Sequence, residues 1–173
     1  MPTLAQTLQT TGPVSLLLRK ARRMGLRDTA DYIALAVARG CIHYRAAAKS
    51  GAKPREADLG NDELTILLLI GENPYDPTAI RCAANLARSP DIRPERLARL
   101  AVMEKCERVL AHIARAGAAH DSEGRCFWNE ILRLMPAQPA RREADLPHWS
   151  RFVSMPGIQR HGVVPATWLV PRP

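Results

Sequence analysis

Apolar side chains recur along most of this chain with the spacing of an amphipathic α-helix. In the N-terminal part, the pattern predicts one helix over residues 13–24 and a second over residues 28–49. Gly25 can close the first helix and Gly40 can bend or break the second, because glycine takes left-handed backbone conformations easily. A polar stretch over residues 46–60 then predicts a loop.

The run from Leu64 to Ile70 has no charged interruption, which suits either a fully buried helix or a core strand. We expect this run to lie in a helix that Asn61 caps. Asp62 and Glu63 fall where the free N–H groups of a first turn favour carboxylates. In addition, the sequence offers no second strand that could pair with this run.

Three further helices are predicted in the second half of the chain. Asp76 as a cap, followed by Pro77 in the first turn, begins a helix over residues 77–88. The longest expected helix extends from Pro94 to Arg115, because its apolar residues alternate at three- and four-residue intervals. A last helix is expected from Glu123 to Met135.

The composition agrees with this helical pattern. Hydrophobic residues make up 46% of the 173 residues and aromatic residues only 5%, and the common alanine and leucine are good helix formers. We therefore predict an all-α fold, a single compact bundle of about six helices over residues 1–135. Seven of the fourteen prolines fall in residues 136–173, which predicts an irregular Pro-rich C-terminal arm. Trp149, Phe152 and Trp168 make this arm too apolar for a solvated coil, so we expect it to pack on the helices.

Charge is the strongest functional signal in the sequence. The net charge is +8, and such an excess favours contact with nucleic acid, an anionic membrane surface or an acidic protein. Five cations crowd into nine residues at the first predicted helix and its end: Arg19, Lys20, Arg22, Arg23 and Arg27. Guanidinium groups pair with phosphate or carboxylate oxygens through two parallel hydrogen bonds. Two alternatives stay open, a merely solvated face and a compositional preference for arginine.

A second basic stripe, at helical spacing, lies on the longest expected helix. It consists of Lys105, Arg108, His112 and Arg115. A recognition helix in DNA presents such a face, although no helix-turn-helix pattern frames this one. Residues 56–76 have the opposite character, with six acidic residues and no lysine or arginine. This segment could dock on the basic cluster within one molecule or between two copies, which leaves a homo-oligomer open.

The sequence predicts no metal and no cofactor. The cysteines Cys41, Cys82, Cys106 and Cys126 form no C-x-x-C pair, so we expect reduced thiols. Cys41 and His43 are two residues apart and point to different sides of a helix. His120 and Cys126 flank a loop, but no second matched pair accompanies them.

These observations predict a non-enzymatic helical interaction module that binds an acidic macromolecular partner through the basic first helix. The alternative is a nucleic-acid-binding or regulatory protein that uses the same arginines. An enzyme is a distant third possibility, with Glu72 and Asp76 lining a pocket at the turn over residues 71–77. Because no apolar stretch approaches the roughly eighteen residues of a membrane span, we expect a cytoplasmic protein.

Overall fold

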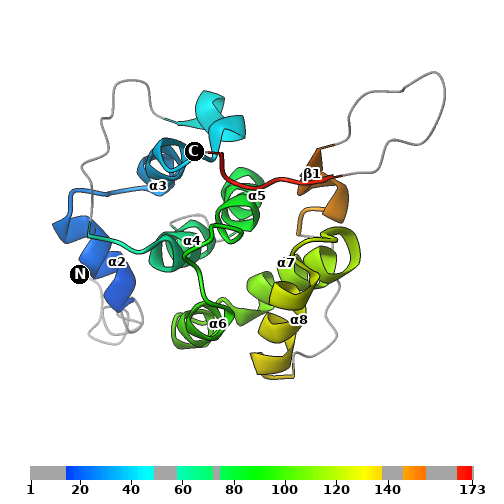
Figure 1. The fold of residues 1–173 in the computed structure, drawn as a ribbon. Coiled ribbons are helices and arrows are strands. Elements are labelled where there is room, and N and C mark those ends of the chain that lie inside the picture. Colours follow the sequence, from blue (N-terminus) through cyan, green and yellow to red (C-terminus); the bar gives the residue numbers. More distant parts are fainter. Residues whose placement is uncertain (1–14, 49–57, 72–74, 138–145, 155–166, 173) are drawn as a thin grey trace, which may run out of the picture.

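The computed structural model describes residues 15–48, 58–71, 75–137, 146–154 and 167–172 (Figure 1). Within these residues the chain forms seven α-helices and one two-stranded sheet, which confirms the all-α prediction. The elements in chain order are α2 (Leu16–Arg23), α3 (Thr29–Ala38), the 3-10 helix η1 (Ile42–Ala47), α4 (Asn61–Ile70), α5 (Pro77–Leu86), α6 (Pro94–Met103), α7 (Glu107–His120), α8 (Arg125–Leu134), the 3-10 helix η2 (Trp149–Arg151), β1 (Val153–Ser154) and β2 (Thr167–Trp168). The first residues of the helix expected over 13–24 lie outside the described part.

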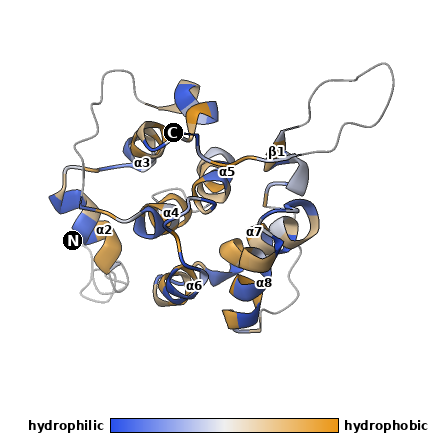
Figure 2. Cartoon of the chain, viewed as in Figure 1, coloured by the Kyte–Doolittle hydropathy of each residue, from blue (hydrophilic) through white to orange (hydrophobic). Residues whose placement is uncertain are grey.

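Helix α4 forms the centre of the bundle. It packs against α2, α3, α5 and α6, which surround it in Figure 1, and seven of its ten residues are buried. Burial on nearly every side explains why the sequence of α4 has no polar stripe. The expected helix, and not the alternative core strand, is confirmed for this run. The outer helices α2, α6 and α8 instead carry hydrophobic and hydrophilic residues side by side, as Figure 2 shows.

The cap of α4 differs from the prediction. Asn61 is the first residue of the helix, and Gly60 is the N-cap. The carboxylate of Glu63 reaches back and accepts the Gly60 N–H at 3.1 Å. This hydrogen bond satisfies a backbone N–H at the start of the helix without a cap from Asn61. The Asn61 side chain instead accepts a hydrogen bond from Arg39 at 2.9 Å and donates one to Asp91 at 2.8 Å.

Helices α2, α3 and α6 all end at a residue in the left-handed region, with φ of 85° at Gly25, 104° at Gly40 and 57° at Lys105. In each case the N–H of the following residue donates to the carbonyl five residues earlier, at 2.9–3.0 Å. This hydrogen bond closes a Schellman turn, for which glycine is the usual residue. The predicted breaks at Gly25 and Gly40 are therefore confirmed, and a separate short helix, η1, follows the second.

The break at Lys105 contradicts the prediction of one helix from Pro94 to Arg115. The chain forms α6 and α7 instead, so the bundle has one helix more than expected, and α7 continues past Gly117 to His120. A left-handed lysine costs about 1–2 kcal/mol relative to a helical one. Tertiary packing outweighs that cost, because the break allows α6 and α7 both to pack against α8.

The C-terminal arm is anchored by buried aromatic side chains. Trp168 is buried, and its indole N–H donates to the carbonyl of Ala84 in α5 at 3.2 Å. Its ring lies against Trp128 of α8 and Phe152 of the arm, with centroid distances of 5.3 and 5.5 Å. Strands β1 and β2 are antiparallel, and Val153 lies opposite Trp168. The expected packing of the arm on its own helices is confirmed for the described residues.

The end of the chain continues across α5 toward the end of α3 (Figure 1). There the backbone N–H of Arg172 donates to the carbonyl of Gly40 at 2.9 Å. A Cβ at Gly40 would lie 2.4 Å from the Arg172 carbonyl oxygen. Gly40 thus ends α3 and also leaves room for the arm.

Candidate functional site

The basic cluster lies on α2 and the turn that follows it. The helix begins after Ser15, whose side chain accepts the Leu18 N–H at 3.0 Å. Only Leu17 and Ala21 of α2 are buried, and residues four apart share one face of a helix. α2 is therefore attached to the bundle mainly along a narrow apolar edge, and Leu16, Arg19, Arg22 and Arg23 are exposed.

The structure divides the five cations of this cluster into two groups. Lys20 Nζ lies 2.8 and 2.7 Å from the two carboxylate oxygens of Glu63 at the start of α4, so this cation acts within the molecule. The other four side chains are exposed: Arg19, Arg22, Arg23 and Arg27. Within the described part of the chain, no ion pair involves any of these four arginines.

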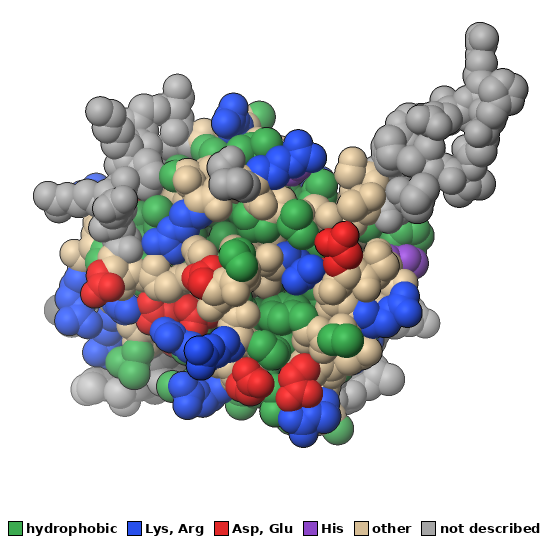
Figure 3. All heavy atoms as spheres, viewed as in Figure 1, with side chains coloured by type: hydrophobic (Ala, Val, Ile, Leu, Met, Phe, Trp, Pro, Cys, Tyr) green, Lys and Arg blue, Asp and Glu red, His purple; other side chains and the backbone are tan. Residues whose placement is uncertain are grey.

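Acidic residues of the segment over 56–76 also have partners within the molecule. Asp62 is buried and forms an ion pair with Arg96 of α6. Asp76 caps α5, because its Oδ1 accepts the N–H groups of Thr78 and Ala79 at 2.8 and 2.9 Å. Figure 3 accordingly shows basic and acidic side chains interspersed over the face that it displays.

The second basic stripe is divided by the break between α6 and α7. Lys105 lies in the turn, whereas Arg108, His112 and Arg115 lie on α7. His112 points toward the arm, where its Nε2 lies 2.7 Å from the carbonyl oxygen of Pro147. Since a carbonyl only accepts, Nε2 is the donor. These four residues do not form one outward face.

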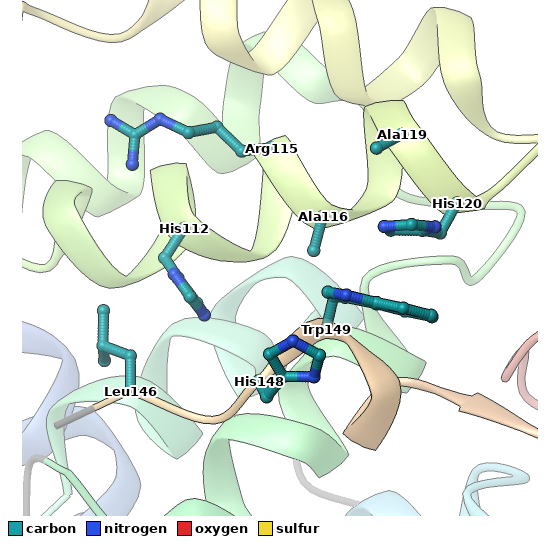
Figure 4. Close-up of a pocket in the computed structure, with 8 residues that line it drawn as sticks. All are labelled: His112, Arg115, Ala116, Ala119, His120, Leu146, His148 and Trp149. Carbon is teal, nitrogen blue, oxygen red and sulfur yellow. The ribbon is translucent and has the colours of Figure 1, made fainter. Parts of the chain in front are cut away.

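A cavity of about 440 Å³ lies between α7 and the segment that leads into η2 (Figure 4). Helix α7 contributes His112, Arg115, Ala116, Ala119 and His120, which have the spacing of one helix face. The arm contributes Leu146, His148 and Trp149. Three of the five histidines of the chain therefore meet at this cavity, which we call the α7–arm groove.

The rings in the α7–arm groove have defined contacts. His120 stacks on Trp149 with a centroid distance of 3.8 Å and an interplanar angle of 14°, as Figure 4 shows. His148 Nδ1 accepts the Ser150 N–H at 3.4 Å and lies 2.9 Å from Ser150 Oγ. A neutral ring that accepts at Nδ1 carries its proton on Nε2, so His148 has an N–H donor at Nε2.

A buried polar network fixes the end of α7 beside the groove. Asp121 follows His120 and is buried. Its Oδ2 accepts hydrogen bonds from Arg88 Nε at 2.6 Å and from Trp128 Nε1 at 2.8 Å. A Cβ at Gly117 would lie 2.4 Å from Trp128 Nε1, so the last turns of α7 approach the indole closely because residue 117 is glycine.

Of the residues that line this groove, the sequence analysis had assigned only residues of α7 to a candidate site. It included His112 and Arg115 in a basic stripe, and it considered His120 only with Cys126, which is exposed on α8. The recurrence of His112, Ala116 and His120 at four-residue intervals was an available signal. No comparable sequence pattern indicated that Leu146, His148 and Trp149 of the arm would lie beside α7. Helical periodicity does not show which helix a distant segment packs against.

The turn proposed for an enzyme pocket borders a second cavity of about 430 Å³, lined by Asp76 together with Asp28 and Thr29. Both carboxylates cap helices: Asp28 Oδ1 accepts the Asp31 N–H at 3.0 Å, and Asp76 caps α5. Glu72 lies outside the described residues. The contacts of the described residues at this turn are therefore those of helix capping.

All four cysteines are free thiols, and only Cys126 is exposed. Burial raises the pKa of the Cys106 thiol to about 12, and the carboxylates of Glu107 and Glu104 add to the increase. A hydrogen bond with Cys41, together with burial, raises the pKa of Cys82 well above its ordinary value. Among the described residues, no group of three or more His, Cys, Asp or Glu side chains is arranged to hold a metal ion.

No protein-family model matches the chain, and no match is found among curated proteins or solved structures. The fold itself defines the class, an all-α helical bundle with a C-terminal arm packed on it. No helix in the described segments combines the length and the apolar content needed to cross a bilayer.

Proposed function

We propose that this protein is a non-enzymatic helical interaction module that binds an acidic macromolecular partner through α2. One observation carries the proposal. Of five clustered cations, Lys20 is paired with Glu63, while the four arginines of the cluster are exposed and have no ion pair among the described residues. Exposed guanidinium groups without an internal ion pair can form paired hydrogen bonds with the carboxylates of a partner.

The apolar residues of α2 favour a protein partner. Leu16 is 69% exposed at the start of the helix, and Leu18 and Met24 are half-buried. A helix that presents arginines beside an exposed leucine matches a groove with an acidic rim and an apolar floor. Charge would then guide the encounter, and Leu16 would add buried area in the complex.

Nucleic acid is the second candidate, because the same arginines can pair with phosphate oxygens. The net charge of +8 supports it. Two features weaken it. Lys20 is already neutralised by Glu63, and α2 has no aromatic residue on which an unpaired base could stack.

The deciding experiment measures binding of two fluorescent probes, a poly-glutamate peptide and a random DNA duplex, by anisotropy at low salt. The test variant changes Arg19, Arg22 and Arg23 to Glu. The matched control changes Arg93, Arg99 and Arg125 to Glu, since these side chains are also exposed and the net charge changes equally. We expect the wild type to bind poly-glutamate, the test variant to lose binding, and the control to retain it.

Equal loss in both triple variants would show that net charge, and not α2, is responsible, which contradicts the proposal. If the duplex binds and the peptide does not, the nucleic-acid alternative replaces it. In that case each lost phosphate contact should reduce the slope of log affinity against log salt by about one.

A further inference from the structure

We propose that the partner of α2 is an acidic amphipathic helix that also contacts the end of α6. This inference rests on the function proposed above and deepens it, because it adds a second element to the interface and specifies the side chains of the partner. The interface, which we call the α2–α6 surface, consists of the exposed residues Leu16, Arg19, Arg23, Met103 and Lys105.

Two exposed apolar side chains lie where α2 meets α6. Leu16 is 69% exposed and Met103 is 63% exposed, the two highest values among the large apolar residues of the described chain. The half-buried Glu104 joins their segments, because its Oε1 accepts the Leu17 N–H at 3.3 Å. In Figure 2 the hydrophobic first turn of α2 points toward α6. Single exposed apolar residues are ordinary, whereas neighbouring ones indicate a contact site.

Unpaired cations accompany the apolar residues on both elements. On α2, Arg19 and Arg23 follow Leu16 by three and seven residues, which is the spacing of one helix face. At the end of α6, the exposed Lys105 follows Met103 in the turn. None of the three cations has an ion pair among the described residues. The α2–α6 surface therefore offers a partner both apolar contact and positive charge.

The backbone at Lys105 supports a contact at this turn independently. Its φ of 57° lies in the left-handed region, which glycine adopts without strain and lysine does not. The corresponding turns after α2 and α3 have glycine, at Gly25 and Gly40. Strained residues cluster at functional sites, where the side chain is needed. A contact between the Lys105 ammonium group and the partner explains why lysine occupies a turn that glycine would form more stably.

A second helix matches the spacing of these groups. Leu16, Arg19 and Arg23 span about 10 Å along α2, since each residue advances a helix by about 1.5 Å. On a helix packed along α2, leucine and glutamate at the same intervals would lie beside them. The carboxylates would pair with the guanidinium groups, and the apolar side chain would contact Leu16 and Met103. Such a helix supplies the apolar floor and the acidic rim expected of the partner.

Three fluorescein-labelled probes test the proposal by anisotropy with the full chain. The probes are poly-glutamate, a glutamate-rich peptide with leucines at helical spacing, and a peptide of the same composition in scrambled order. We expect the amphipathic peptide to bind the wild type about tenfold more tightly than the scrambled peptide. The reason is that only the ordered sequence presents leucines and carboxylates together on one helix face.

Met103→Gln removes the exposed apolar side chain without changing the charge. We expect it to weaken binding of the amphipathic peptide about fivefold and to leave the affinity for poly-glutamate unchanged. Val170→Gln is the matched control, at a residue that is 38% exposed on the arm, which Figure 1 shows on the side of the bundle away from α6. The control should keep the wild-type affinity for both probes.

Lys105→Gly separates a binding role from a structural one. Glycine relieves the left-handed strain, so the midpoint of thermal unfolding should rise. Loss of the ammonium group should nevertheless weaken binding of the amphipathic peptide about threefold, and the difference from the wild type should vanish in high salt. A lysine with only a structural role would not combine a gain in stability with a loss of affinity.

The outcomes distinguish this inference from the function proposed for α2. If neither poly-glutamate nor the amphipathic peptide binds the wild type, both fail. If poly-glutamate binds but the ordered and scrambled peptides bind equally, only the acidic amphipathic helix is overturned. Equal affinities in Met103→Gln and Val170→Gln, or an unchanged affinity in Lys105→Gly, remove the end of α6 from the interface. Tighter binding of a random DNA duplex than of the amphipathic peptide assigns the surface to nucleic acid instead.

Discussion

Helices α2 and α7 each carry cations that the sequence groups into a basic stripe, but the two helices have different neighbours. α2 lies at the edge of the bundle and buries only Leu17 and Ala21. α7 is covered on one side by α8 and on another by the arm, and it buries seven of its fourteen residues. A basic stripe therefore lies on an exposed helix in α2, whereas in α7 the arm packs beside it and forms one wall of a groove.

Whether a charged stripe forms an exposed surface depends on the segments that pack around its helix. At α2, Glu63 pairs with Lys20 and Glu104 accepts the Leu17 N–H at 3.3 Å, while Arg19, Arg22 and Arg23 remain exposed. On α7 a segment that follows His112 by 35 residues returns and accepts its hydrogen bond. A stripe faces solvent only if no later segment packs over it, and that depends on tertiary structure.

The largest effect is expected from removing the anchor of the arm. Trp168→Ala eliminates the contacts with Trp128 and Phe152 and the hydrogen bond to Ala84. We expect the free energy of unfolding to fall by about 3–5 kcal/mol, measured by urea denaturation. Val170→Ala, at a residue that is 38% exposed, should change it by less than about 0.5 kcal/mol. Similar losses in both variants would mean that the arm is not anchored by its tryptophan.

A smaller loss is expected where α7 meets α8. Gly117→Ala places a Cβ against the Trp128 indole, at 2.4 Å from Nε1 before any relaxation. We expect a loss of about 1–3 kcal/mol, the usual range for overpacking a filled site. In a Trp128→Phe background the same change should cost less, because the smaller ring leaves room. An equal cost in both backgrounds would show that the indole is not the obstacle.

A gain is expected at the turn before α7. Lys105 has φ of 57°, so Lys105→Gly should stabilise the protein by about 0.5–1 kcal/mol, since relief of backbone strain exceeds the added entropy of the unfolded chain. Arg99→Gly, inside α6, should destabilise it by about 1 kcal/mol. Thermal unfolding of the two variants should therefore shift in opposite directions. Shifts in the same direction would argue against a left-handed residue at 105.

The smallest effect is expected on α2 itself. Lys20→Gln breaks the ion pair with Glu63, but the lysine side chain is 36% exposed, so screening limits the loss of stability to about 0.2–1 kcal/mol. Arg22→Gln should change stability less, because no ion pair holds Arg22 among the described residues. The difference between the variants should vanish in high salt. An equal loss in both would mean that Arg22 also has an internal partner.

Some features of this protein follow from local sequence. The start of α5 at Asp76 and Pro77 depends on contacts within a few residues, so capping preferences predict it. The same holds for the end of α2 at Gly25, where glycine takes a φ of 85° without strain. The prediction of all-α structure with an apolar arm rests on the same local information.

Other features depend on which segments meet in space. Nothing within a few residues of Lys105 favours a left-handed lysine, and the break there exists because both α6 and α7 pack on α8. Likewise His120 and Trp149 are 29 residues apart and come together because the arm packs on α7, where Pro147 accepts a hydrogen bond from His112. Local periodicity therefore predicts where helical segments form, whereas the break at Lys105 and the exposure of polar faces depend on packing, because burial is a property of all segments together.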